Sequence, residues 1–462
     1  PSTPTSSTPA RADWLDQDKF GLFIHWGLYS QIAKGEWYMH SRKVPIEEYS
    51  KLAETCNPTK FSATEWVKIA KDAGMKYIVI TSKHHDGFAL FDSQVSDYNI
   101  VDATPFKRDM IAELKAACDA QGIKLGLYYS HAQDWYHRGG SHHYNWKNPS
   151  GMDEMQHYLN NISLPQVKEI LTQYQPAIIW YDTPRRMTPA LAEPFSKLVR
   201  EISPSTLINS RIALDGNKMD KVSQKDLDML KSLDTDYISY ADREIPANSP
   251  WKHWETCMTL NGSWGFTKGD NAWKTPSHVI QQLLEVVSKN GAFLLNVGPT
   301  AEGEFPAESV TVLKQVGDWL KLNGDAVYGA QPVSFNLPGT PTAESLKRKA
   351  DKQARFAKLK RDAPHTSLER DFPWLATRKG DTIHLTIFDW PTDNTLTIAK
   401  VSQDIKNIQD IESIHLATES GKPLKPLKHS LSDGTLTISL PTKPAGNLPP
   451  VLRLRLIAAQ RR

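Results

Sequence analysis

Short apolar segments alternate with amphipathic segments between Phe20 and about Ala330. Apolar runs predict strands at 21–27, 76–88, 124–130, 177–184, 206–212 and 292–299. Helical periodicity predicts helices at 63–74, 108–122, 163–175, 191–203, 275–291 and 308–327. Strands that are apolar throughout and alternate with helices indicate a parallel sheet covered by helices. The number of repeats and the length of roughly 310 residues favour a (β/α)8-like barrel over an open doubly wound sheet.

The pattern changes after residue 330. From about Pro373 onward, short segments alternate apolar and polar residues with a period of two, and Asp, Gly and Pro separate them. This pattern predicts a small antiparallel β-sandwich after the barrel. We therefore expect a disordered N-terminal segment at 1–12, a (β/α)8-like catalytic domain at 13–335, a linker at 336–372 and a β-sandwich at 373–462. The basic run at 347–361 is interpreted as a solvated surface, with contact to an acidic polymer as the alternative.

Composition excludes several classes of function. The 462 residues carry a net charge of only +3, which gives no reason to expect a nucleic acid or an anionic membrane as partner. No apolar run approaches the roughly 18 residues of a membrane helix, and three cysteines are too few for a disulfide framework. The 14 Trp and 15 Tyr are more informative, because flat amphipathic rings suit sugar faces. Nothing in the sequence indicates the oligomeric state.

Polar residues stand where the predicted strands end. The residues in question are His25, His84, His85, Asp86, Tyr128, Tyr129, Asp182 and Arg211. Any one of them has an ordinary structural interpretation, such as a satisfied histidine or barrel packing. In a barrel, however, the carboxyl ends of the strands meet at one face, where active sites lie. The five strand ends together predict a site at that face.

The chemistry of this predicted site can be narrowed. The first strand ends in His25-Trp26-Gly27, not in the His-x-His pair typical of metal-dependent barrel hydrolases. Adjacent His84 and His85 are expected to point in diverging directions on an extended chain, which suits two hydroxyls better than one metal ion. The sequence has no Gly-x-Ser-x-Gly elbow and no Gly-x-Gly-x-x-Gly turn after the first strand. What remains suits a sugar held by its hydroxyls and cleaved by two carboxyl groups, with no metal or other cofactor.

Several segments together resemble the α-L-fucosidases of glycoside hydrolase family 29. They are FGLFIHWG, EWY, residues 49–93, YNIVDATPFKRD, GLYYS, IIWYDTP, WETCMTLNGSWGF and LLNVGPTAEGEFP, and the match runs from about Trp14 to Tyr328. The resemblance implies a retaining exo-acting hydrolase that releases terminal α-L-fucose from oligosaccharides or polysaccharides through a covalent intermediate. Two alternatives stay open: a metal-dependent barrel hydrolase and a non-catalytic fucose-binding protein. We expect a secreted, periplasmic or lysosomal-type location, with a signal peptide already removed.

The resemblance also implies roles for individual residues. Asp182, in WYDTP, matches the nucleophile of the family, which agrees with a carboxylate held rigidly at a strand end. Residues implied to bind or surround the fucose are His25, Glu36, Trp37, His84, His85, Tyr128, Arg211 and Trp264. Trp264 is expected to pack on the C5-methyl face, with simple loop packing as its alternative.

The acid/base residue is less well defined, because the family places it in a variable loop. Many members have Thr-Pro-Glu where this chain has residues 236–256. Counting back from the shared Ile-Pro favours Asp242, with Glu255 and Glu244 as rivals. An apparent insertion at 214–233 precedes this loop and leaves both the acid and the leaving-group site open.

Overall fold

The computed structural model describes residues 10–141, 150–336, 370–417 and 425–457, with short pieces at 340–341, 343, 346–347, 350–351 and 354. Residues 1–9 and most of the linker at 336–372, including most of the basic run at 347–361, lie outside the described residues. The last three residues of the expected disordered segment, Ala10–Ala12, form a 3-10 helix.

The chain divides into two compact units. The first contains Pro1–Trp14, Phe20–Trp273 and Leu294–Leu313, and the second contains Leu15–Lys19, Lys274–Phe293 and Lys314–Arg462. The domain boundaries expected from the sequence at 13, 335 and 373 stay predictions.

Eight strands form one sheet in the order β5-β4-β3-β2-β1-β8-β7-β6. They are β1 Phe20–Ile24, β2 Tyr77–Lys83, β3 Lys124–Tyr129, β4 Ile178–Tyr181, β5 Leu207–Ile208, β6 Ile238–Ser239, β7 Trp254–Thr259 and β8 Ala292–Val297. Pairing is parallel in β1–β2, β2–β3, β3–β4, β4–β5 and β6–β7.

The two ends of the strand order meet, and this closes the sheet. The Asp236 amide donates to the Ile208 carbonyl at 2.9 Å, and the Ser210 amide donates to the Tyr237 carbonyl at 2.9 Å. The predicted (β/α)8-like barrel is therefore confirmed.

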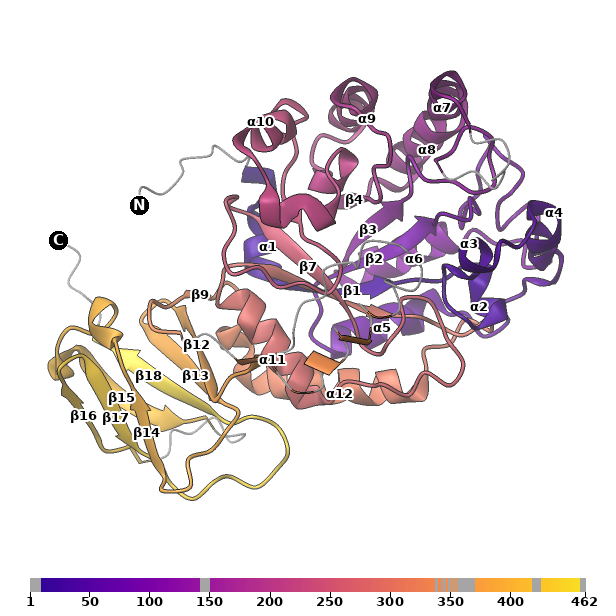
Figure 1. The fold of residues 1–462 in the computed structure, drawn as a ribbon. Coiled ribbons are helices and arrows are strands. Elements are labelled where there is room, and N and C mark those ends of the chain that lie inside the picture. The colour runs from indigo at the N-terminus through magenta and orange to yellow at the C-terminus, as the bar shows by residue number, and fades with distance from the viewer. Residues whose placement is uncertain are drawn as a thin grey trace. The chain divides into compact units, whose positions relative to one another are not determined.

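Helices follow the strands along the chain (Figure 1). They are α1 Asp13–Asp18, α2 Tyr29–Ile32, α3 Tyr38–Arg42, α4 Ile46–Tyr49, α5 Ala63–Asp72, α6 Met110–Gln121, α7 Met152–Tyr158, α8 Leu164–Tyr174, α9 Pro189–Ile202, α10 Gln224–Ser232, α11 Pro276–Val287 and α12 Ala307–Asn323. Polar N-caps start several of them: Ser62 accepts from the Glu65 amide, and Asp109 accepts from the Ala112 amide.

Two barrel strands, β6 and β7, were not predicted from the apolar pattern. β6 has only two residues, and β7 reads Trp-Glu-Thr-Cys-Met-Thr, which contains too many polar residues to look like a buried strand. The segment 214–233, which looked like an insertion, forms the crossover between β5 and β6 and carries α10. Glu255 consequently lies inside a barrel strand and not in a loop.

The two larger antiparallel sheets of the second unit confirm the predicted β-sandwich. One has the order β15-β18-β13-β12-β9 and the other β14-β17-β16. The strands are β9 Gln331–Pro332, β12 Trp374–Lys379, β13 Thr382–Ile387, β14 Thr395–Ile398, β15 Ile411–Leu416, β16 His429–Ser432, β17 Thr435–Ser439 and β18 Val451–Leu456; β10 Thr340–Pro341 and β11 Arg370–Asp371 form a separate pair. Its core includes Trp374, Ile383, Ile398, Ile438 and Leu452. Within the described parts of both units, no helix combines the length and the apolar character of a membrane span.

Candidate active site

One pocket lies where the barrel strands end, and both aromatic and charged side chains line it. Its lining consists of Phe23, His25, Glu36, Trp37, His84, His85, Tyr128, Trp180, Asp182, Thr183, Arg185, Arg211, Asp215, Asn217, Asp242, Cys257 and Trp264. All eight residues that were expected to surround the sugar are among them, together with Asp182 and Asp242. The structure therefore brings these predicted residues together in one pocket, and their individual roles stay predictions.

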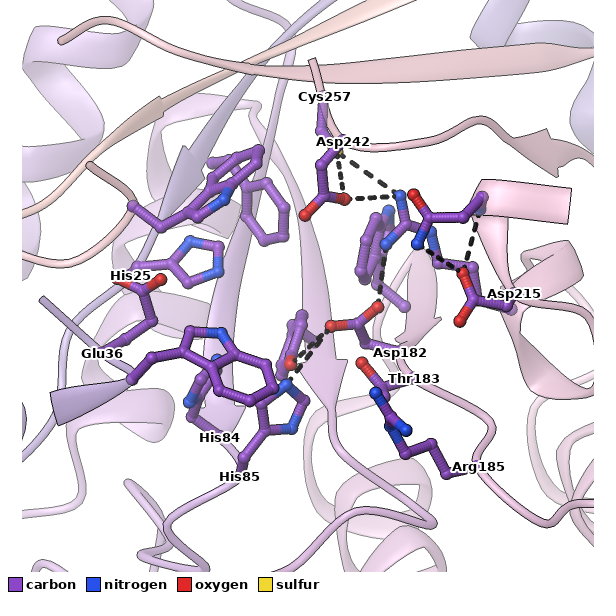
Figure 2. Close-up of a pocket in the computed structure, with 17 residues that line it drawn as sticks. His25, Glu36, His84, His85, Asp182, Thr183, Arg185, Asp215, Asp242 and Cys257 are labelled. Carbon is purple, nitrogen blue, oxygen red and sulfur yellow. Dashed lines mark hydrogen bonds and ion pairs between the residues drawn. The ribbon is translucent and has the colours of Figure 1, made fainter. Parts of the chain in front are cut away.

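Asp182 follows the last residue of β4 directly, so a buried strand fixes its position. Its side chain is 15% exposed and faces the pocket (Figure 2). The Tyr128 hydroxyl donates to Oδ2 at 2.9 Å, and Arg211 Nη1 donates to Oδ1 at 2.8 Å. Both carboxylate oxygens thus have a fixed partner, which sets the orientation of the group relative to the cavity.

Arg211 joins two carboxylates. Its Nη1 pairs with Asp182, and its Nη2 pairs with Asp242 Oδ1 at 2.8 Å and donates to the Tyr240 carbonyl at 2.5 Å. The guanidinium lies over the Trp180 ring, 4.7 Å from its centroid. Asp182 and Asp242 are therefore held on neighbouring nitrogens of one planar group.

The charge state of Asp182 follows from these contacts. Burial raises the pKa of this carboxyl group, but the positive charge and hydrogen bond of Arg211, with smaller contributions from His85 and Tyr128, outweigh burial and lower it below its usual value. Asp182 stays ionised, as a nucleophile requires.

A pH prediction follows from this balance. We expect the acid limb of the kcat/KM profile, which reports the free enzyme, to lie below the usual aspartate pKa of about 3.9. Arg211→Met should move that limb to higher pH, because burial then acts on Asp182 without its main counter-charge. Profiles on an aryl α-L-fucoside would measure this, with Arg211→Lys as the charge-conserving control. An unmoved limb in Arg211→Met would show that Asp182 does not set it.

His25, His84 and His85 form one neutral group in the pocket, and His85 Nε2 lies 3.7 Å from Asp182 Oδ2 (Figure 2). His25 Nδ1 lies 2.6 Å from Asn296 Oδ1, and His85 Nδ1 lies 2.6 Å from Ser130 Oγ. Burial lowers the pKa of His25 to about 4 and that of His85 to about 3. Neutral imidazoles can donate to and accept from sugar hydroxyls.

The expectation that His84 and His85 diverge is wrong. Their ring centroids lie 4.1 Å apart, and both rings line the same pocket. The alternation of an extended chain does not apply, because β2 ends at Lys83 and the chain turns, with the Gly87 amide donating to the His84 carbonyl at 3.0 Å.

Glu36 and Trp264 come from two loops that support each other. The Gly265 amide donates to Glu36 Oε2 at 2.8 Å, and Asn296 Nδ2 donates to the Trp264 carbonyl at 2.8 Å. The Trp264 ring lies 5.2 Å from His25, centroid to centroid, so it packs within the loop cluster and also faces the cavity. An indole at this place offers an apolar face to a sugar.

The three acid/base candidates lie in different environments. Asp242 lines the pocket, and its side chain is 50% exposed. Glu244 is half-buried and is not part of the lining. Glu255 is fully buried under the pocket, where it accepts from Tyr77 and Trp180. Burial raises the pKa of Glu255 to about 7, a useful value for a general acid. A general acid must nevertheless reach the leaving oxygen, so the geometry favours Asp242.

Glu255 instead supports the floor of the pocket. Its Oε1 accepts from Trp180 Nε1 at 2.8 Å, and its Oε2 accepts from the Tyr77 hydroxyl at 2.9 Å. The Trp180 ring stacks on Tyr128 at 5.5 Å and lies under Arg211. Glu255 thereby fixes the indole against which both partners of Asp182 pack.

Two substitutions of Glu255 separate support from acid catalysis. Glu255→Gln keeps an acceptor for Trp180 and can donate to the Tyr77 oxygen, so we expect activity within about ten-fold of the native enzyme. Glu255→Leu removes the carboxyl group that accepts from Trp180 and Tyr77, at a cost of roughly 1 to 3 kcal/mol for each lost hydrogen bond, and should lower both Tm and kcat. Thermal unfolding and kinetics on an aryl fucoside would measure both. A Glu255→Gln variant slowed by about 10² or more, chiefly on poor leaving groups, would make Glu255 the acid instead.

Seven lining residues were not predicted as site residues. They are Phe23, Trp180, Thr183, Arg185, Asp215, Asn217 and Cys257. Phe23 and Trp180 stand two positions before His25 and Asp182, so the strand period of two could have placed them on the same face. Asp215 and Asn217 belong to the crossover interpreted as an insertion, and no local pattern marks Cys257.

Fold and site together define a sugar-cleaving barrel hydrolase, and comparisons with known proteins agree. The family model described as Alpha-L-fucosidase matches residues 2–325. Human plasma α-L-fucosidase is 30% identical over 336 residues, covering 68% of each chain. The structure of α-L-fucosidase isoenzyme 1 from Paenibacillus thiaminolyticus aligns with a TM-score of 0.75 and 29% identity over 97% of this chain and 99% of that one.

A solved complex is also similar. The α-L-fucosidase AlfC from Lactobacillus casei, in complex with α-L-fucose product, aligns with a TM-score of 0.60 and 34% identity over 68% of this chain and 99% of that chain. The chain belongs to the α-L-fucosidase family and is a glycoside hydrolase.

Proposed function

We propose that this protein is a retaining exo-α-L-fucosidase that removes terminal α-L-fucose from fucosylated oligosaccharides or polysaccharides. The observation that carries this proposal is the pair of carboxylates on Arg211. Asp182, which is rigid and ionised, lies 2.8 Å from Nη1, and Asp242, which is more exposed, lies 2.8 Å from Nη2. Two carboxyl groups close together are the equipment of a retaining glycosidase, for which about 5 to 5.5 Å is the usual separation.

The first step uses Asp182 as nucleophile. Its carboxylate oxygen forms a bond to the anomeric carbon while the bond to the leaving oxygen breaks, and protonated Asp242 gives its proton to that oxygen. The product is a fucosyl ester of Asp182. Arg211 and Tyr128 hold the carboxylate in place before the attack, which limits the reorganisation needed in the transition state.

The second step uses Asp242 as a base. Its carboxylate takes a proton from water, the water oxygen attacks the anomeric carbon, and the ester bond to Asp182 breaks. Free fucose leaves with the same anomeric configuration as the substrate. Both steps use residues of this chain alone.

The part of the pocket formed by the histidines, Glu36 and Trp264 suits a deoxysugar. Glu36, His25 and His84 present polar groups to hydroxyls, and Trp264 presents an aromatic face to the methyl group. A buried pocket wall of this kind gives specificity because each unpaired polar group costs affinity when the wrong sugar binds.

The location of activity stays an expectation. Relatives include proteins named plasma and tissue α-L-fucosidase. They support our proposal that this protein acts in a secreted, periplasmic or lysosomal-type compartment.

The stereochemistry of the first-formed product tests the proposal. Proton NMR during hydrolysis of 4-nitrophenyl α-L-fucoside should show α-L-fucose before the β anomer appears by mutarotation. Initial β-L-fucose would mean inversion and would overturn the double-displacement mechanism. Fucose binding without turnover would favour the non-catalytic alternative, and activity lost to a chelator and restored by a divalent metal would favour the metal-dependent one.

A further inference from the structure

The two catalytic carboxylates divide the pocket into two parts (Figure 2). On one side lie the residues that were expected to surround the fucose, including His25, Glu36 and His84. On the other side of Asp182 lie Thr183, Arg185 and Asp215, which belong to no role discussed so far. Asn217, from the same segment as Asp215, also lines the pocket.

The segment that carries Asp215 and Asn217 lies against Arg211, the residue that pairs with Asp242. A Cβ on Gly216 would be 2.8 Å from the Tyr240 carbonyl and 3.0 Å from Arg211 Nη2, so only glycine permits this close approach. Arg211 Nη2 is also the atom that pairs with Asp242. The 3-10 helix Gly216–Lys221 therefore begins on the acid's side of the pocket, which is where the leaving group must lie if Asp242 protonates its oxygen.

The polar groups of this segment are arranged in advance. Asp215 Oδ1 accepts from both the amide and the side-chain nitrogen of Asn217, each at 2.9 Å. This arrangement fixes the two side chains relative to each other and leaves Asp215 Oδ2 and Asn217 Oδ1 as acceptors at the pocket wall. Such paired acceptors suit vicinal hydroxyls of a sugar.

Arg185 supplies donors on the same side. Thr183 has φ 46, a left-handed conformation that is unusual for a β-branched residue. The Arg185 amide donates to the Thr183 carbonyl at 2.7 Å, and its carbonyl accepts from Ser141 Oγ at 3.0 Å. The backbone is thus held while the exposed guanidinium reaches the pocket, and no carboxylate of the described residues pairs with it.

We propose that Arg185, Asp215 and Asn217 form the subsite for the sugar to which fucose is attached, and that they recognise its hydroxyl groups. The inference rests on the proposed function, because it takes Asp182 and Asp242 as nucleophile and acid. If the subsite is correct, the 214–233 crossover determines which fucosylated glycan is cleaved, and the residues that surround the fucose do not.

Two substrates with different leaving groups test the subsite. α-L-Fucosyl fluoride releases a single ion and leaves the subsite unfilled, whereas a fucosyl disaccharide fills it. We expect Arg185→Ala to lower kcat/KM for the best substrate among α-1,2-, α-1,3-, α-1,4- and α-1,6-linked fucosyl disaccharides of galactose or N-acetylglucosamine by about ten-fold, and Asn217→Ala by about three-fold. The same variants should lower the value for fucosyl fluoride far less. Arg455→Ala, a surface change, is the matched arginine control.

The outcomes separate this inference from the proposed function. Native enzyme that fails to hydrolyse fucosyl fluoride would overturn the proposed function itself. Native enzyme that hydrolyses the fluoride but no disaccharide, or variants that change both substrates equally, would overturn the subsite while leaving the fucosidase activity standing.

Discussion

Asp182→Gly should lose nearly all activity on 4-nitrophenyl α-L-fucoside, a loss of at least about four orders of magnitude in kcat. The reason is that, among the described residues that line the pocket, Asp182 is the carboxylate that both Tyr128 and Arg211 hold. Glycine also leaves space where the carboxylate stood. Added azide should occupy that space, attack the anomeric carbon from the same face and partly restore release of nitrophenol, with a β-fucosyl azide as product.

Two controls make the Asp182→Gly result specific. Asp97→Gly makes the same Asp-to-Gly change in an exposed loop, and this variant should keep native activity. Thermal unfolding should show that Asp182→Gly still folds. A folded Asp182→Gly variant with native activity would remove Asp182 from the role of nucleophile, and a folded inactive variant without azide recovery would assign it to binding only.

Asp242→Asn should slow substrates according to their leaving groups. An amide cannot give or take the proton, so we expect kcat/KM for fucosyl disaccharides to fall about 10²- to 10⁴-fold. A substrate that needs no protonation, such as 2,4-dinitrophenyl α-L-fucoside, should lose much less in its first step. Rates across a series of aryl fucosides would therefore depend more steeply on the leaving-group pKa in the variant.

Glu244→Gln is the matched control for Asp242→Asn. Glu244 lies two residues from Asp242 but does not line the pocket. The Glu244→Gln variant should therefore behave like the native protein across the series of aryl fucosides. If Glu244→Gln instead showed the steep dependence and Asp242→Asn did not, the loop would have to rearrange in the complex and Glu244 would be the acid.

The position of the pocket at the strand ends was predictable because it depends on a simple regularity. Strands β1 to β4 are short apolar runs, and each ends at or beside a polar residue that faces the pocket, as His25 after β1 and Asp182 after β4 do. A barrel brings those ends together whatever the helices do. Alternation along the strand would also have predicted Phe23 and Trp180, two positions earlier on the same face.

The detailed arrangement of the site depends on contacts between distant residues, which no local sequence pattern reveals. Glu255 looked like a loop carboxylate because β7 contains polar residues, and only the fold shows that Tyr77 and Trp180, from other strands of the barrel, donate hydrogen bonds to its buried carboxyl group. The turn that aims His84 and His85 into one pocket begins at Lys83, which the sequence places inside an apolar run. The link between Asp182 and Asp242 is Arg211, and its reach across the barrel end depends on the spacing of β4, β5 and the following loop.

Trapping the covalent intermediate would show which residue of this protein is the nucleophile. The enzyme would be incubated with 2-deoxy-2-fluoro-α-L-fucosyl fluoride. The fluorine at C2 slows both steps, but the fluoride leaving group keeps the first step fast, so the ester with the enzyme should accumulate. Peptide mass mapping after digestion should place one fluorofucosyl group on the peptide that contains Asp182, and Asp182→Gly should remain unlabelled. A label on any other carboxylate, or an active enzyme that never becomes labelled, would show that Asp182 is not the nucleophile.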